Sequence, residues 1–397
     1  MPSGGAGRAG PLALACAVLL GLAGCGEAGD TADPTPAPSQ RPAPVATPTG
    51  GQDPGAGPGP GHTASATEQP STAAPAPAPD RESGRATVLF TGDLMLARSI
   101  GDLILTEGPQ APWEGIADEL AGADLRVGVL ESAVGSTGVA EDKAYTFQAP
   151  PEAAESLAAG GFDVVTLANN HSYDFGAAGL LETLDLVDQA GVRTVGAGDG
   201  QRSARSGVVL GAEGVQLGFL GYVSVPDDWA GYRNRDWAAT GDGPGVAWAE
   251  PELIAEDVAR LVEEVDHVVV LLHAGDEGST AVNPVQVAAA EAAFQAGASA
   301  VVGSHPHVLQ GWSLEDGRLV AWSLGNTVFD GFGAIPESLE TALLTVTFTA
   351  DTVEDASFVP VVVDDRGLPQ ALDADDPVGR VVLDRLDALP APVPGQR

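Results

Sequence analysis

The stretch HVVVLLHAGDE, residues 267–277, joins a buried strand to residue types that bind metals. Its apolar run is short and rich in β-branched valine, which is typical of a buried strand. The run ends in His273, and Asp276 and Glu277 follow within four residues. Because ligands of layered α/β folds gather at the carboxyl ends of such strands, we expect these side chains to line a functional site.

Five further apolar runs end in the same way, in residue types that bind metals or transfer protons. In chain order, the residues at the six ends are Asp93; Glu131; Asn169, Asn170 and His171; His273, Asp276 and Glu277; His305 and His307; and Asn326. The chain has only six histidines, and four of them stand at these ends. This clustering predicts a metal site.

Helical patterns alternate with these runs. They occupy four segments, residues 150–160, 176–191, 251–266 and 283–297. Alternation of strands and helices indicates a layered α/β domain. Residues 340–350 and 356–367 instead alternate apolar and polar residues with no helix between them, so we expect an antiparallel pair that closes a sheet.

One segment, residues 226–250, fits neither pattern. It places four large aromatic side chains among glycine, aspartate and arginine, namely Trp229, Tyr232, Trp237 and Trp248. Two interpretations are open for this irregular insertion. It is either a lid over the site or a loop that its aromatic side chains anchor to the domain.

The N-terminus predicts export and anchoring. Residues 1–24 have the positive charge and apolar run of a signal peptide, and the run is too short and glycine-broken for a stable membrane span. The run ends in LAGC, with the cysteine at Cys25. This resembles the lipobox of bacterial lipoproteins, which implies acylation of Cys25 and a lipid anchor on the outer face of the cell membrane. The alternative is an ordinary signal peptide that is cut nearby.

Composition divides the rest of the chain. Residues 25–85 are rich in Pro, Ala, Gly, Ser and Thr and nearly lack large apolar side chains, so we expect a disordered tether after the lipidated cysteine. We expect one globular domain over residues 86–387 and a disordered tail over 388–397. The formal net charge is −37, which disfavours nucleic acid as a direct partner. It also disfavours a polyanionic substrate unless a metal mediates the contact.

The polar residues at the strand ends suit a transition metal. Carboxylate oxygens are hard ligands and imidazole is a borderline ligand, and together they suit Mn, Fe or Zn. His305 and His307 flank a proline, and in an extended segment residues two apart project to the same side. Both rings can then enter one cavity. The alternative is a pair of surface histidines with ordinary hydrogen bonds.

The segment ANNHSYD offers proton chemistry beside a ligand. The Asn170 amide oxygen can bind a metal, and His171 can protonate a leaving group. Asn169 and Asp174 are candidates to orient the ligands by hydrogen bonds, and so is Glu277. The competing interpretation is that the Asn-Asn-His run forms only a turn and a helix cap.

These segments carry a family resemblance over residues 88–360. The matching stretches are GDLML, LES, KAYTFQAPP, GFDVVTLANNHSYDFG, GVRTVGAG, HAGDE, GSHPHVLQ and SLGNTVFD. In order and spacing they resemble the CapA-type poly-γ-glutamate capsule-biosynthesis proteins, which have a calcineurin-like metallophosphoesterase fold. The resemblance implies a four-layer α/β/β/α sandwich, metallo-dependent phosphatase-like, with a metal centre between two sheets.

The resemblance also implies roles for individual residues. His171 would be catalytic. The metal ligands would be Asp93, Glu131 (bridging), Asn170, His273, His305 and His307. Met95 stands where metallophosphoesterases usually have a histidine, which removes a nitrogen ligand from the first of two metal positions. Val129, Ala274 and Gln148 stand where capsule relatives often carry Asn, Trp and Arg, respectively.

Three functions follow as hypotheses, and whether the protein is an enzyme is left open. In the first, a surface lipoprotein supports synthesis or export of poly-γ-glutamate or a related capsular polymer, with one or two metal ions and with membrane synthase or export proteins as partners. In the second, a metal-dependent phosphoesterase or hydrolase uses metal-activated water and has no capsule role. In the third, the domain is a non-catalytic metal-binding scaffold.

Substitution of Cys25 tests the anchor. Cys25→Ala should release the protein from membranes into the medium or leave it unprocessed, because the acylated atom is lost. Mass spectrometry of the purified protein detects the lipid, and Cys16→Ala, inside the removed segment, is the control. Acylation that persists in Cys25→Ala would contradict the lipobox assignment.

Overall fold

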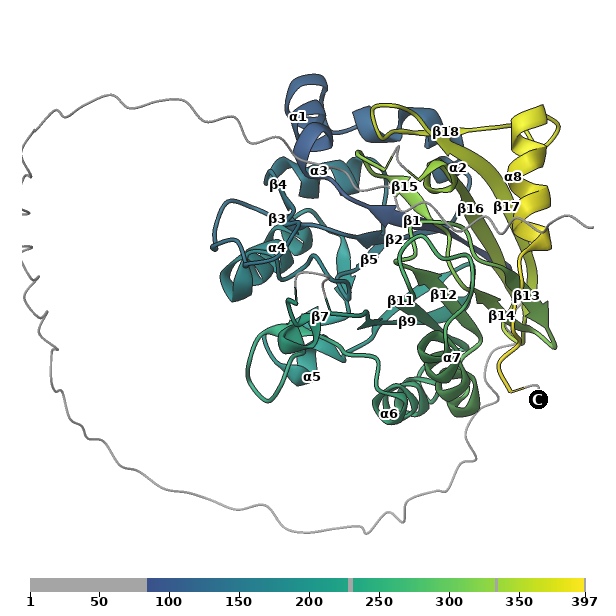
Figure 1. The fold of residues 1–397 in the computed structure, drawn as a ribbon. Helices are drawn as coiled ribbons and strands as arrows, with labels where there is room; N and C mark the ends of the chain where they lie inside the picture. The colour runs from purple at the N-terminus through teal and green to yellow at the C-terminus, as the bar shows by residue number, and fades with distance from the viewer. Residues whose placement is uncertain (1–83, 228–230, 333–334, 396–397) are drawn as a thin grey trace, which may run out of the picture. The chain divides into compact units, whose positions relative to one another are not determined.

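A computed structural model describes residues 84–227, 231–332 and 335–395 (Figure 1). The predicted signal segment, the lipidation site Cys25 and the predicted tether up to residue 83 lie outside these residues. No helix in the described part of the chain is long and apolar enough to cross a membrane.

The first sheet has eight strands in the order β18-β17-β16-β1-β2-β5-β6, and β15 pairs with β1. Their bounds are β1 Ala86–Leu94, β2 Leu125–Leu130, β5 Val164–Thr166, β6 Arg193–Val195, β15 Asn326–Val328, β16 Glu340–Phe348, β17 Val353–Val363 and β18 Pro369–Ala371. Strands β1, β2, β5 and β6 run parallel, whereas β16 and β17 form the expected antiparallel pair.

The second sheet has six strands in the order β13-β14-β12-β11-β9-β8. They are β8 Val208–Ala212, β9 Val215–Ser224, β11 His267–Ala274, β12 Ala300–Ser304, β13 Trp312–Glu315 and β14 Arg318–Ala321. Strands β9, β11, β12 and β14 are parallel neighbours. Two short pairs complete the strands: β3 Ala133–Val134 with β4 Gln148–Ala149, and β7 Ala197–Gly198 with β10 Gly245–Val246.

Alternating side chains stack the two sheets face to face. In β1, Val88 and Phe90 enter the core between the sheets, whereas Leu89 enters the outer core. In β11, Val269 points into the core between the sheets and Val270 points to the opposite face. Because successive residues of a strand face opposite ways, each central strand serves two apolar layers.

Helices cover the outer face of each sheet. Over the first sheet lie α1 Arg98–Glu107, α3 Glu152–Ala159 and α4 Gly176–Gln189. Over the second lie α6 Pro251–Leu261 and α7 Pro284–Ala296. Figure 1 shows the resulting sequence of layers from α1 and α3 through the two sheets to α6 and α7. The fold is therefore the expected four-layer α/β/β/α sandwich.

The remaining helical segments are η1 Ala111–Ile116, α2 Ala117–Ala121, α5 Gln201–Ala204, η2 Asn234–Trp237, η3 Pro336–Leu339 and α8 Pro377–Ala388. Helix α8 packs on β16 and β17 through Val382 and Leu386. Pro392 lies past the end of α8, in the segment that we expect to be a disordered tail. Its carbonyl oxygen accepts a hydrogen bond from Trp322 Nε1 at 3.2 Å.

Alanine substitutions should distinguish the core between the sheets from the surface by their effect on the free energy of unfolding. Phe219 in β9 is fully buried between the sheets, so Phe219→Ala should lower the free energy of unfolding by about 3–5 kcal/mol. Val209, in the adjacent strand β8, is 41% exposed, and Val209→Ala should change it by less than about 0.5 kcal/mol. Urea denaturation measures both, and equal losses would contradict the assigned core.

Candidate metal centre

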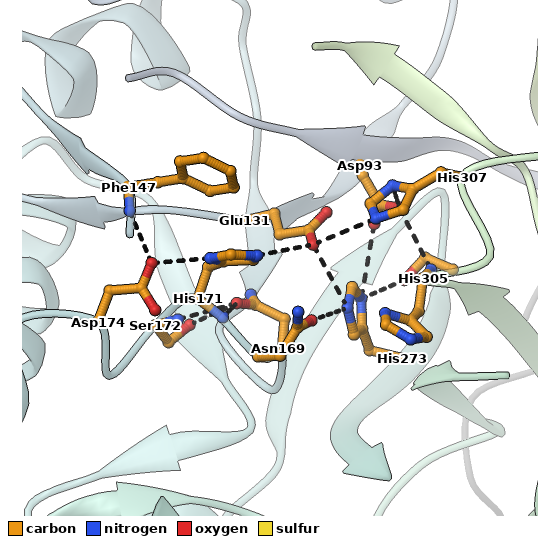
Figure 2. Close-up of polar contacts among 12 residues, drawn as sticks. Asp93, Glu131, Phe147, Asn169, His171, Ser172, Asp174, His273, His305 and His307 are labelled. Atoms are coloured by element: carbon orange, nitrogen blue, oxygen red, sulfur yellow. Dashed lines mark hydrogen bonds and ion pairs between the residues drawn. The ribbon is translucent and has the colours of Figure 1, made fainter. Parts of the chain in front are cut away.

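Five of the predicted metal ligands lie in one cluster with His171 (Figure 2). The sixth, Asn170, contacts His273 Nε2 through Oδ1 at 2.8 Å. Asp93 lies near the end of β1, Glu131 follows β2 and His273 lies near the end of β11. None of the seven residues is more than 7% exposed. Two triads bring ligand atoms within 4.8 Å of one another: Asp93, Glu131 and His273, and Glu131, His305 and His307.

Glu131 is the residue that the two triads share. Its Oε1 lies 3.7 Å from His273 Nε2, 3.9 Å from His307 Nε2 and 4.0 Å from His171 Nε2. Asp93 contacts the same rings on their other side, with Oδ1 3.5 Å from His273 Nδ1 and Oδ2 3.5 Å from His307 Nδ1. The two carboxylates therefore face one cluster of imidazoles.

The His-Pro-His segment reaches this cluster by a different geometry from the one expected. The expectation of an extended segment was wrong, because His305 and His307 have φ angles of +95° and +58°. Residues other than glycine rarely adopt this backbone conformation, and such strained positions concentrate at functional sites. The turn brings the His305 backbone N–H to Asp93 Oδ2 at 3.2 Å, so it also orients that carboxylate.

Unpartnered buried atoms show that this cluster fits a divalent cation. Within the described residues, Asp93 Oδ1, both Glu131 carboxylate oxygens and His305 Nδ1 are buried without a hydrogen-bond partner. Leaving such atoms unpaired is costly, and all three residue types ligate transition metals. A divalent metal would satisfy them together, so these residues suit one.

Burial favours the uncharged forms of the same groups. It raises the pKa of Asp93 to about 7, and burial together with the Asp93 charge raises the pKa of Glu131. Burial lowers the pKa of His307 to about 4 and that of His273 and His305 well below the usual range. The histidines are thus neutral near pH 7, which is the form that binds metals.

Hydrogen bonds fix the orientation of two of these rings. His273 contacts Asn170 Oδ1 through Nε2 and Ser304 Oγ through Nδ1, both at 2.8 Å. His307 Nδ1 contacts Asn326 Oδ1 at 2.8 Å. Such contacts hold metal-binding histidines in position, and both ring nitrogens of His273 are engaged in this structure.

His171 is oriented by Asp174 and Phe147. Its Nδ1 lies 2.7 Å from Asp174 Oδ2, and the Phe147 ring stacks on it with centroids 4.1 Å apart. This leaves Nε2 directed toward Glu131 (Figure 2). Burial lowers the pKa of the imidazole, and the Asp174 carboxylate opposes that change.

Asn169 shapes the turn that carries Asn170 and His171. Its Nδ2 donates to the Leu130 carbonyl at 2.7 Å, and its Oδ1 accepts from the backbone N–H groups of His171 and Ser172 at 2.9 and 3.0 Å. This fastens the turn after β5 to the end of β2. Asn169 therefore contacts the backbone of this turn, and its role in orienting the metal ligands stays a prediction.

A cavity of about 270 Å³ opens beside the cluster. Its lining includes Tyr145, His171, Glu277 and His305 together with Lys143. Glu277 therefore lies at the cavity and not among the two triads. The sequence analysis did not single out Lys143. In the structure its Nζ donates to Asp174 Oδ1 at 2.7 Å.

The positions that depart from the family pattern are filled by ordinary contacts. Met95 is fully buried in the apolar core, and its Sδ accepts from the Ala97 backbone N–H at 3.2 Å. Gln148 Nε2 donates to the Thr137 carbonyl oxygen at 2.8 Å. Val129 and Ala274 are buried. None of the four adds a ligand or a cation to the cluster.

In the segment 226–250, the described residues favour anchoring by aromatic side chains. Trp237 is buried and belongs to the core beneath α4, and Tyr232 and Trp248 pack partly buried against it. Trp229 lies outside the described residues.

Comparison with solved structures finds weak overall likeness. A hypothetical protein from Thermus thermophilus is 20% identical, with a TM-score of 0.44 over 69% of this chain and 98% of that one. A 5'-nucleotidase from Candida albicans is 12% identical, with a TM-score of 0.37 over 75% of this chain and 55% of that one.

Comparison of sequences is more specific. The chain is 30% identical over 258 residues to the capsule biosynthesis protein CapA of Bacillus anthracis, covering 63% of this chain and 61% of that protein. It is 30% identical over 244 residues to the PGA biosynthesis protein CapA of Bacillus subtilis, covering 61% and 62%. A probable polyglutamine synthesis accessory protein of Mycobacterium tuberculosis is 28% identical over 319 residues, covering 75% and 82%.

The match thus spans about three fifths of the length of the two CapA proteins. Residues 87–331 match the family model described as bacterial capsule synthesis protein PGA_cap. This is more than half of the chain, and the protein therefore belongs to the PGA_cap family of bacterial capsule synthesis proteins.

Proposed function

We propose that this protein is a surface lipoprotein that supports synthesis or export of poly-γ-glutamate or a related capsular polymer through its metal centre. Membership of the PGA_cap family supports the capsule role, and two relatives are named as CapA proteins. The observation that carries the metal centre is the pair of buried carboxylates, Asp93 and Glu131, whose unpartnered oxygens face three histidines.

The metal we propose is Mn, Fe or Zn, as one or two ions. Asp93, Glu131 and His273 would hold one, and His305 and His307 would complete the set with Glu131 as the shared ligand. The chemistry supplied by a bound divalent ion is activation of water and neutralisation of charge on a substrate oxygen. Met95 adds no nitrogen ligand beside Asp93, so we expect the position that Asp93 holds to bind its metal more weakly.

His171 is the residue of this chain best placed to move a proton. Asp174 and Phe147 hold its ring with Nε2 facing both the ligand cluster and the cavity. An anionic substrate group in the cavity would favour the imidazolium, as the Asp174 carboxylate already does. His171 would then protonate a leaving group.

This arrangement also favours the second candidate, a metal-dependent phosphoesterase or hydrolase without a capsule role. An oriented histidine beside a metal site has the parts that water-activating hydrolysis requires. A non-catalytic metal-binding scaffold would need the ligands but not His171. The substrate in the enzymatic cases would be an anionic polymer or a phosphoester.

The proposed location is the outer face of the cell membrane, with Cys25 as the lipid anchor. Membrane synthase or export proteins are the partners that a capsule role implies. The net charge of −37 argues against nucleic acid as a partner.

The first test of these alternatives compares His171→Ala with His305→Ala. His171 would act on a proton, so its loss should retain metal and fold, but should lower turnover by roughly 10²–10⁴-fold if the protein is an enzyme. His305→Ala removes a ligand and should lower metal content and cell-surface polymer together. Polymer output is measured in cells, and metal content is measured on both purified proteins.

For a scaffold, His171→Ala should leave polymer output intact while His305→Ala impairs it. Equal metal loss in the two variants would refute the assignment of His171 as a residue that does not bind the metal.

The second test concerns pH and metal removal. Because the pKa of Asp93 is raised to about 7, the metal-free carboxyl holds a proton below that pH, and metal binding must displace it. Affinity for Mn²⁺ or Zn²⁺ should therefore rise from about pH 6 to about pH 7, by up to about tenfold for one displaced proton. Calorimetry in buffers of different ionisation enthalpy measures the proton release.

Chelator-treated protein should also melt at a lower temperature and recover when Mn²⁺ or Zn²⁺ is added, since a ligand of the folded state stabilises it by mass action. A melting temperature that no divalent transition metal raises would contradict the metal centre.

A further inference from the structure

Lys143 is the only lysine in the sequence, and every other member of the 18 Lys and Arg residues is an arginine. It lies in the segment between β3 and β4, with its side chain 4% exposed. A chain that otherwise uses arginine for its cations thus places its single ammonium group inside the protein, beside the candidate metal centre. Arginine and lysine differ in shape and hydration, so the exchange of one for the other is not neutral at a packed site.

Lys143 Nζ makes two hydrogen bonds and one contact with an aromatic ring. Nζ donates to Asp174 Oδ1 at 2.7 Å and to the Asn170 carbonyl oxygen at 2.5 Å. The Trp237 ring centroid lies 4.5 Å from Nζ, within the range of a cation–π contact. Lys143 lines the cavity, but its ammonium is already committed, which argues against a role as the clamp for an anionic substrate.

These contacts connect two parts of the centre. Asp174, which pairs with Lys143, is the carboxylate that holds His171 Nδ1 at 2.7 Å. Asn170, whose carbonyl Lys143 also holds, presents its side-chain Oδ1 to His273 Nε2 at 2.8 Å. One ammonium therefore fixes the partner of the candidate acid and the backbone of a candidate ligand.

Trp237 and its hydrogen-bond partners cover this ammonium. Trp237 lies over it, and Trp237 Nε1 donates to the Tyr232 hydroxyl at 2.7 Å. That hydroxyl donates to Glu141 Oε2 at 2.8 Å, and the Glu141 carbonyl accepts from the Lys143 backbone N–H at 2.9 Å. The cover is thus tied back to the turn that carries the lysine, which shields the Lys143–Asp174 pair from water.

We propose that Lys143 is the positioning residue of this centre. Its ammonium, covered by Trp237, sets the orientation of His171 through Asp174 and the position of Asn170 through the backbone carbonyl. The inference rests on the proposed function only where metal affinity is the readout.

The test uses the full chain with Lys143→Met, and Arg205→Met as the matched control. Arg205 also pairs with a buried carboxylate, Asp257, at 2.8 Å, but that pair contacts none of the site residues. Two readouts are taken: affinity for Mn²⁺ and Zn²⁺ by calorimetry, and the ¹⁵N NMR signals of the histidine rings in metal-free protein. The His171 signal is identified by its loss in His171→Gln.

Lys143→Met should lower metal affinity by about 10–100-fold, the usual effect of losing a residue that orients metal ligands. It should also replace the single His171 signal with several or with a broadened one. Arg205→Met should reduce stability and leave both readouts unchanged. An unchanged affinity with an unchanged His171 signal in Lys143→Met would overturn the proposal, because a purely structural ion pair predicts that result.

The two readouts separate this proposal from the proposed function. If the wild-type chain binds neither ion, the metal function fails, and the His171 signal alone decides the role of Lys143. If Lys143→Met does not fold, Lys143→Met combined with Asp174→Asn removes both buried charges at once, and the metal readout is repeated on it.

Two further variants examine the geometry. Lys143→Arg keeps the charge in a planar group and should not restore metal affinity, whereas full recovery would show that charge alone suffices and would overturn the positioning role. Trp237→Leu leaves both buried charges paired but removes the cover. Because Lys143 is the only lysine, an amine-specific reagent followed by peptide mass spectrometry reports on it directly. Labelling should rise in Trp237→Leu, and equal labelling in the wild type would overturn the role assigned to Trp237.

Discussion

Two carboxylates that are buried with too few hydrogen-bond partners constrain this fold. Asp93 and Glu131 are fully buried, and within the described residues three of their four carboxylate oxygens accept no hydrogen bond. A charged group in such a place is tolerated only when another charge compensates it or when it takes up a proton. The three histidines around them are kept neutral by the same burial, so they supply lone pairs and no positive charge. The charge of these candidate ligands can therefore be balanced by protons or by a bound cation.

The layered fold delivers these groups because strands of both sheets end at the same place. Close packing of the backbone is needed there, and glycine permits it at two positions. A Cβ on Gly92 would lie 2.0 Å from the Gly325 carbonyl oxygen, and one on Gly303 would lie 2.0 Å from the Trp322 carbonyl oxygen. The left-handed turn at His305 and His307 comes just after Gly303 in the chain. Its conformation costs on the order of 1–3 kcal/mol for each residue. The core between the sheets offsets that strain.

The layered fold and most members of the site could be predicted from sequence, because they follow from short-range patterns. Apolar runs mark the strands, and the polar residue after each run marks the edge where ligands gather, as at Asp93 and Glu131. The turn at His305 could not be predicted in this way, since the residue types allow an extended segment and only tertiary packing excludes it.

Lys143 was missed for a related reason. It lies in a segment with no strand or helix periodicity, and its partner Asp174 is 31 residues away in the sequence. Pairing over such a distance leaves no trace in a local pattern. Two signals were available: the stretch KAYTFQAPP, which begins with Lys143, and the presence of a single lysine in a chain whose other basic residues are arginines.

The electrostatics of the site differ from those of the whole chain. At physiological ionic strength, charges more than about 8 Å apart across solvent are largely screened, so a net charge of −37 acts on an anionic polymer mainly at contact. In the described part of the chain, Lys143 lines the cavity beside the centre, and Arg98 lines a neighbouring cavity that His171 and His307 also line. Both cations are engaged: Lys143 with Asp174 and Asn170, and Arg98 with the Asp330 carbonyl oxygen at 2.7 Å and with its carboxylate. Under the proposed function, attraction for an anionic group at this centre would come mainly from a bound metal, so metal binding and polymer recognition would be linked.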